Sequence, residues 1–113
     1  MDAHALTAIS PIDGRYADKC EALRPITSEF GLMRYRTLVE VRWLEALADT
    51  GASGMPTLSV SARSRLASIA ADFSLDDARR VKAIEATTNH DVKAIEYFLR
   101  ESFSDSEELL AQG

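Results

Sequence analysis

The sequence of 113 residues has one cysteine, no long apolar run and no excess of basic residues. Cys20 alone cannot form a disulfide within the chain, which fits a reducing compartment, and we expect the cytoplasm. Arg or Glu interrupts every apolar stretch before it reaches the roughly 20 residues that cross a bilayer. No charged segment followed by an apolar run opens the sequence, so no signal peptide is predicted. The formal net charge of −5 argues against general binding to nucleic acid or to an anionic membrane.

The sequence also lacks repeats, low-complexity tracts and segments with the alternation of a β-strand. Hydrophobic residues make up 46% of the chain, which suffices for a modest core in one small domain. We therefore predict a single all-α domain over residues 1–113, a small bundle of about four helices with a loop-rich N-terminal segment.

Caps and apolar spacing mark the helices. Thr27 or Ser28 can cap a long helix that runs to about Thr50, with Gly51 as its C-terminal stop. Ser74 and Asp77 form a capping box for another helix. Besides the long one, helical segments are predicted over residues 60–73, 75–86 and 91–100, with a last turn over 107–111. Residues 7–24 lack periodicity and are predicted to form an ordered loop, with 11–24 and 51–59 irregular.

The long helix carries apolar residues on two sides, separated by Arg36 and Glu40. Such a helix must be covered on both sides, and a chain this short has little spare structure with which to do so. Either its own neighbours surround it, or one side packs on something outside these residues. The first stripe is Leu32, Tyr35, Val39, Trp43 and Ala46, and the second is Phe30, Met33, Val41 and Leu44.

An uncommon polar cluster precedes the best-formed helix, in the stretch TTNHDVKAIEYFL from Thr87 to Leu99. Thr88 followed by Asp91 has the form of a capping box, so Thr88 or Asn89 is predicted to end a loop. Asn89, His90 and Asp91 then lie at a helix N-terminus, where free backbone N–H groups favour an anionic ligand. The alternative is an ordinary helix start with an exposed His.

The same stretch predicts a buried helix face and no metal site. Val92, Ile95 and Leu99 recur at helical spacing with Phe98 beside them. A metal site is not predicted, because adjacent residues near a helix start do not converge as ligands and no second His or Cys lies nearby.

A second candidate segment is dense in turn residues, from Ser10 to Tyr16. Asp13 and Gly14 favour a tight turn that presents Arg15 and Tyr16. The Arg side chain offers a planar fork of donors suited to phosphate or carboxylate, and Tyr adds a hydroxyl. The alternative is an exposed Arg with the Tyr ring lying on the core.

Three stretches together resemble a known family. They are LTAISPIDGRY from Leu6 to Tyr16, VEVRWLEAL from Val39 to Leu47, and TTNHDVKAIEYFL from Thr87 to Leu99. The chain resembles the N-terminal domain of the adenylosuccinate lyase family in its bacterial form, within the fumarase and aspartase superfamily. The resemblance runs in the same order along nearly the whole chain.

The resemblance implies a lyase of purine biosynthesis that cleaves adenylosuccinate to AMP and fumarate and performs the same elimination on the succinyl-carboxamide ribotide. It implies no redox or metal cofactor. A base abstracts a proton from the succinyl group while an acid protonates the leaving nitrogen. The resemblance also implies that the complete enzyme is a homotetramer whose active sites form where three subunits meet.

Carried over by motif, Arg15 and Tyr16 are expected to contact the nucleotide phosphate end of the substrate, and Asn89, His90 and Asp91 to line the same pocket. His90 is a possible auxiliary in turnover, but no catalytic acid or base is expected here, because the family's catalytic His, Ser and mobile loop lie further along its subunit. We thus expect an N-terminal fragment of a longer subunit, inactive alone. The alternative is a small helical protein-interaction module.

Overall fold

The computed structural model describes residues 3–51, 54 and 57–112. Every regular element over these residues is an α-helix or a 3₁₀-helix, and none of them is a strand, which confirms the all-α prediction. The chain divides into two compact units, Met1–Leu32 and Met33–Gly113, which are described separately. The single domain over residues 1–113 stays a prediction.

The first unit is more regular than the predicted loop. Because Pro11 pre-sets its own φ and Ser10 Oγ accepts the N–H of Ile12 at 3.2 Å, the chain coils tightly at this point. Segments this short carry no apolar periodicity, which is why the sequence did not predict them. The elements are α1 (Ala3–Thr7), η1 (Pro11–Asp13), η2 (Ala17–Leu23) and α2 (Arg24–Thr27).

The long helix α3 spans Glu29–Thr50, as predicted. Ser28 Oγ accepts the N–H of Gly31 at 3.0 Å, so the predicted cap is confirmed. Gly51 has φ +71°, the left-handed conformation that ends helices and that favours glycine.

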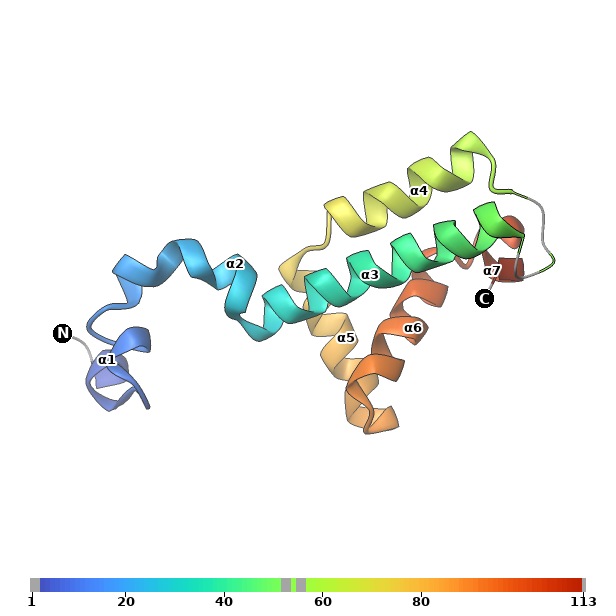
Figure 1. The fold of residues 1–113 in the computed structure, drawn as a ribbon. Helices are drawn as coiled ribbons and strands as arrows, with labels where there is room; N and C mark the ends of the chain where they lie inside the picture. Colours follow the sequence, from blue (N-terminus) through green and yellow to red (C-terminus); the bar gives the residue numbers. More distant parts are fainter. Residues whose placement is uncertain (1–2, 52–53, 55–56, 113) are drawn as a thin grey trace. The chain divides into compact units, whose positions relative to one another are not determined.

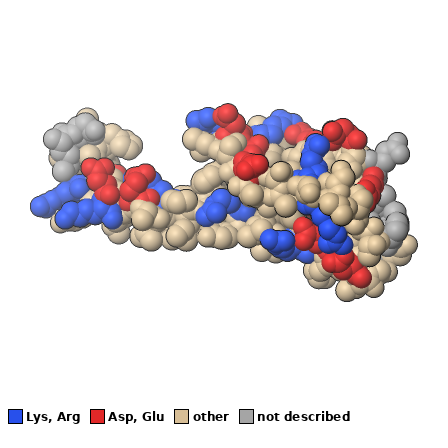
Figure 2. All heavy atoms as spheres, turned by 90° about the horizontal axis from the view of Figure 1, so that it is seen from above, with Lys and Arg blue, Asp and Glu red and all other residues tan. Residues whose placement is uncertain are grey.

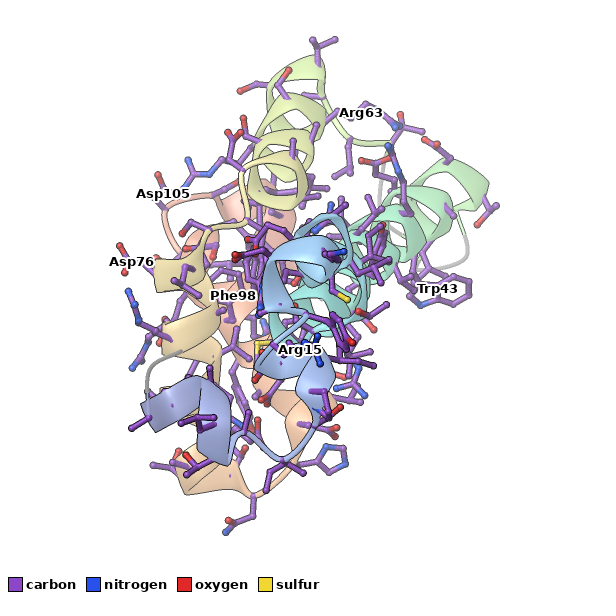
Figure 3. The ribbon with its side chains drawn as sticks, turned by 90° about the vertical axis from the view of Figure 1, so that its left-hand side faces the viewer. Arg15, Trp43, Arg63, Asp76, Phe98 and Asp105 are labelled. Atoms are coloured by element: carbon purple, nitrogen blue, oxygen red, sulfur yellow. The ribbon has the colours of Figure 1, made fainter. Side chains whose placement is uncertain are left out.

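The described part of the chain covers only one of the two stripes of α3. Met33 and Val41 are buried, as is Thr37 between them, whose hydroxyl donates to the Met33 carbonyl at 2.9 Å. On the other side Val39 is 64% and Trp43 59% exposed. Figure 3 shows Trp43 projecting away from the helix. Of the two alternatives for α3, the one in which its own neighbours surround it on both sides does not hold for the described residues.

The helices of the second unit pack around the buried side of α3. The remaining helices are α4 (Val60–Ala71), α5 (Leu75–Thr88), α6 (Asp91–Ser102) and α7 (Glu107–Gln112). From the end of α3 the chain turns back, and α4 runs alongside it (Figure 1), with Arg63 of α4 paired to Asp49 of α3. The capping box of α5 is confirmed, since Ser74 and Asp77 exchange both bonds at 3.1 and 2.9 Å.

The apolar face of α6 fills the core of this unit. The rings of Phe98 and Phe73 meet edge to face, with their centroids 5.6 Å apart. Ile95, Phe98 and Leu99 are buried as predicted. Val92 is 39% exposed and Ala94 is buried instead, so the buried face is centred nearer to Ala94 and Phe98 than the predicted stripe was.

The surface of the second unit mixes charges of both signs. On the face shown in Figure 2, Lys and Arg side chains are interspersed with Asp and Glu. Ion pairs such as Arg65 with Asp105, at 2.9 Å, account for part of this mixture. None of the described helices combines the length and the hydropathy that crossing a bilayer requires.

Candidate functional site

The predicted polar cluster forms the two-residue connection between α5 and α6 and the first residue of α6. The helix α5 ends at Thr88, and Asn89 follows with φ +54° and ψ +31°. Asn tolerates this left-handed conformation better than most residues, because its short polar side chain can bond locally. The Asn89 N–H donates to the Glu85 carbonyl at 2.7 Å and so closes the last turn of α5.

His90 is the N-cap of α6, which corrects the predicted capping box. Its backbone is extended, and its Nδ1 accepts the N–H of Lys93 at 3.2 Å. Thr88, which the sequence suggested as the cap, is the last residue of α5 instead. In the neutral imidazole, an Nδ1 that accepts leaves the proton on Nε2. The cap therefore selects the tautomer in which Nε2 is a hydrogen-bond donor.

Asp91 is held by a charge from another helix. Its Oδ2 lies 3.0 Å from Nη1 of Arg36 on α3, and its Oδ1 accepts the N–H of Val92 at 2.8 Å. The Arg36 bond, followed by the Val92 bond, holds the pKa of the Asp91 carboxyl below its ordinary value. Sequence reasoning missed Arg36 as a site residue, although a basic residue between two apolar stripes of a helix was a signal.

These bonds change how an anion can be held at the turn. Two of the backbone N–H groups at this helix N-terminus, those of Val92 and Lys93, already bond Asp91 and His90. An anionic ligand must therefore be contacted mainly by side chains, of which His90 and Asn89 are exposed. Arg36 offsets the negative charge of Asp91, which otherwise repels an anion.

The loop of the first unit forms the predicted tight turn. The N–H of Tyr16 donates to the Pro11 carbonyl at 2.8 Å. A Cβ added at Gly14 would collide with the Ala5 carbonyl oxygen, so this close approach requires glycine. Beyond the turn, the Arg15 guanidinium lies 5.2 Å from the centroid of the Tyr16 ring.

The structure brings part of the predicted site together. Asn89, His90 and Asp91 are adjacent in the second unit and gain Arg36. Arg15 and Tyr16 are exposed neighbours in the first unit. Their convergence with the α5–α6 turn stays a prediction. Over the described residues, no group of three or more His, Cys, Asp and Glu side chains is arranged to hold a metal ion.

In sequence, the chain is similar to several adenylosuccinate lyases. It is 55% identical to the adenylosuccinate lyase of Vibrio cholerae over 112 residues, covering 98% of this chain and 25% of that protein. The Escherichia coli adenylosuccinate lyase is 53% identical over 112 residues, which cover 98% of this chain and 25% of that protein. That of Haemophilus influenzae is 53% identical over 111 residues, covering 97% of this chain and 24% of the relative.

The chain belongs to the adenylosuccinate lyase family and matches its N-terminal domain only. It spans about a quarter of the length of these curated relatives. No family model matches the chain.

The ion pair at the turn predicts a pH dependence. A carboxyl with a depressed folded-state pKa adds stability above its unfolded value of about 3.9, and this contribution is lost as the pH falls through the folded value. We expect the Asp91 carboxyl to titrate below the ordinary aspartate range, and Arg36→Gln to move its midpoint upward. A carbon-detected NMR titration of the side chain measures both midpoints.

The matched control is Arg42→Gln, which removes a cation from the same helix but breaks a pair with Glu45 instead. This change should leave the Asp91 midpoint where it is. Equal shifts in both variants would mean that the general charge of α3, rather than the Arg36 contact, sets the midpoint.

Proposed function

We propose that this chain is the N-terminal domain of an adenylosuccinate lyase subunit and supplies side chains that bind the nucleotide phosphate of its substrate. The observation that carries the proposal is 55% identity over 98% of the chain to the Vibrio cholerae enzyme. The substrates and products are then adenylosuccinate, AMP and fumarate in purine biosynthesis. We also propose that the assembled enzyme is a cytoplasmic homotetramer without a cofactor.

The proposed role of each site residue follows from its side-chain chemistry. Arg15 offers two parallel donors to a phosphate, and Tyr16 adds a hydroxyl beside it. Asn89 and His90 supply neutral donors from the α5–α6 turn, with Nε2 of His90 carrying the proton. Asp91 is paired to Arg36, so its role is to fix the start of α6 and not to touch the phosphate.

His90 is proposed as an auxiliary to catalysis. A donor aimed at charge that develops in the transition state lowers the barrier more than it strengthens substrate binding. The elimination also needs a positioned base and acid. None of the proposed site residues fills those two roles. The catalytic base and acid are therefore proposed to come from other parts of the complete enzyme.

The second candidate is a helical protein-interaction module. The exposed side of α3, with Val39 at 64% and Trp43 at 59%, favours it, because such a stripe marks a contact surface. The two candidates differ in the gene beyond Gly113. A continuation that encodes a Ser-rich loop ending in M-P-x-K-x-N-P supports the lyase, and its absence supports the module.

The 113-residue chain by itself should not convert adenylosuccinate, because none of the proposed site residues supplies the acid or the base that elimination requires. Loss of adenylosuccinate absorbance is the measurement, with the complete Escherichia coli relative as the positive control. Turnover by the purified chain above a protein-free background would show that the acid and base lie within these residues.

The composite phosphate site can be tested with AMP. If Arg15, Tyr16 and the α5–α6 turn converge, AMP should shift backbone amide signals in both stretches together. We expect dissociation constants in the millimolar range, because an Arg fork and a neutral donor in an open site each contribute on the order of 1 kcal/mol. Titration by two-dimensional NMR gives the affinity and the map.

Adenosine is the matched control ligand, since it lacks only the phosphate, and Arg15→Gln is the matched variant. Both should abolish the paired shifts. Shifts confined to one stretch, or equal shifts with adenosine, would refute the composite phosphate site.

The role of His90 can be separated from its role as a cap. Asn is a strong N-cap, so His90→Asn keeps α6 capped and removes the imidazole, whereas His90→Ala removes both. In the complete lyase subunit, both changes should lower turnover by about 10- to 1000-fold, the range for loss of a transition-state donor. Steady-state kinetics measure the loss.

His4→Ala is the control, because His4 is exposed on α1 and has no proposed role. It should leave turnover unchanged. Full activity in His90→Asn with reduced stability in His90→Ala would assign His90 a structural role alone.

A further inference from the structure

An open groove in the second unit lies apart from the proposed phosphate site. It has a volume of about 290 Å³ and lies between α3, α4 and α6. Its lining includes Val41, Leu66, Leu99 and Phe103, which are all buried or nearly so. Trp43 and the side chains of Leu44 and Leu47 continue this apolar lining toward the exposed side of α3. The groove is thus mainly apolar and joins the uncovered stripe of that helix.

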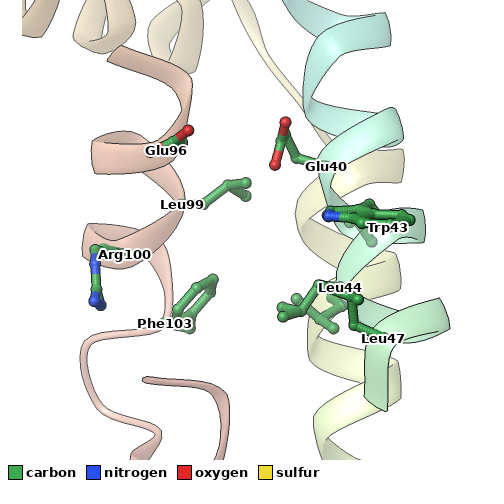
Figure 4. Close-up of a pocket in the computed structure, with 10 residues that line it drawn as sticks. Glu40, Trp43, Leu44, Leu47, Glu96, Leu99, Arg100 and Phe103 are labelled. Atoms are coloured by element: carbon green, nitrogen blue, oxygen red, sulfur yellow. The ribbon is translucent and has the colours of Figure 1, made fainter. Parts of the chain in front are cut away.

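Two carboxylates stand over this apolar lining. Glu40 of α3 and Glu96 of α6 both line the groove and are half-buried. Figure 4 shows their carboxylate groups turned toward each other across the opening. Like charges that face each other at an apolar surface are unfavourable unless a cation lies between them.

The neighbouring cations leave one of these carboxylates uncompensated. Lys93 bonds Oε2 of Glu96 at 2.9 Å. Arg100 also lines the groove, but it already takes part in a contact within the chain. Across the described residues, Glu40 has neither an ion-pair partner nor a side-chain hydrogen bond. Its carboxylate therefore remains available to a ligand.

Trp43 completes a site suited to an organic cation. It lies three residues beyond Glu40 on α3, so the ring and the carboxylate share one face of the helix. Tryptophan is the best aromatic partner for a guanidinium or an ammonium, and a carboxylate beside it adds direct charge pairing. The apolar floor accommodates the hydrocarbon stem that carries such a group.

We propose that the groove receives an arginine or lysine side chain from a polypeptide segment outside these 113 residues, with an apolar residue beside it. The cation pairs with Glu40 over the face of Trp43, and the apolar neighbour packs on Leu99 and Phe103. A volume of about 290 Å³ is at the lower end for a small-molecule pocket and suits a few side chains. Continuity with the exposed stripe of α3 points to a polypeptide that covers both.

The test uses short probes and a built-in reporter. Trp43 is the only tryptophan of the sequence, so its fluorescence reports on the groove alone. The probe acetyl-Leu-Arg-amide should change the Trp43 emission with a saturable, millimolar dissociation constant. Acetyl-Leu-citrulline-amide has the same shape without the charge, and it should bind about three- to tenfold more weakly.

Variants identify which carboxylate binds the cationic probe. Glu40→Gln should weaken the binding of the arginine probe by about three- to tenfold and leave the affinity for the citrulline probe unchanged. Glu96→Gln is a second variant in the same groove with the same expected direction. Glu45→Gln is the control, because it removes a carboxylate from α3 outside the groove lining, and it should leave the affinity unchanged.

Four results would overturn the proposal. These are no saturable change with the arginine probe, equal affinity for the citrulline probe, an unchanged affinity in Glu40→Gln, and n-butylguanidinium binding as tightly as the dipeptide. The last result would identify a site for small organic cations instead of a polypeptide segment. None of them bears on Arg15 or His90, so the proposed phosphate site is tested independently.

Discussion

The left-handed conformation of Asn89 is the constraint on which the candidate site depends. Only Asn89 and His90 connect α5 to α6, so the chain must reverse within two residues, and a positive φ makes this possible. The reversal lets Val81 and Ile84 of α5 share a core with Ile95 of α6. Burial of each such side chain stabilises the fold by about 1.5–3 kcal/mol. The core thus holds the turn, and the turn sets where His90 and Asp91 lie.

Capping and ligand binding compete for the same backbone groups at this turn. A helix N-terminus binds anions through free N–H groups, but His90 and Asp91 bond two of them. Capping secures the start of α6, and it leaves recognition to side chains. Arg36 then matters twice, because it fixes Asp91 and also offsets a negative charge that a phosphate would meet. Its removal is expected to affect the geometry and the electrostatics of the turn together.

The sequence predicted the elements whose signals are local. Ser28, Ser74 and Gly51 ended or began helices as expected, because a cap depends only on residues within one turn. At the α5–α6 turn the sequence suggested Thr88 or Asn89 as the cap of α6, but α5 extends two residues beyond its predicted end and the cap is His90. The Arg36–Asp91 pair joins positions 55 apart and has no local signature. The 3₁₀ turns of the first unit were missed because they are too short for periodicity.

The two sides of α3 relate the proposals to one another. Its buried stripe of Met33, Thr37 and Val41 belongs to the core, and its exposed stripe, which includes Val39 and Trp43, meets no described residue that covers it. Apolar area of this kind is costly to leave in water, so both the lyase and the interaction module require a covering partner. Glu40 lies between the two sides and adds a charge requirement to the apolar one. A partner that satisfies both must carry a cation beside an apolar surface, which is a stricter condition than either stripe imposes alone.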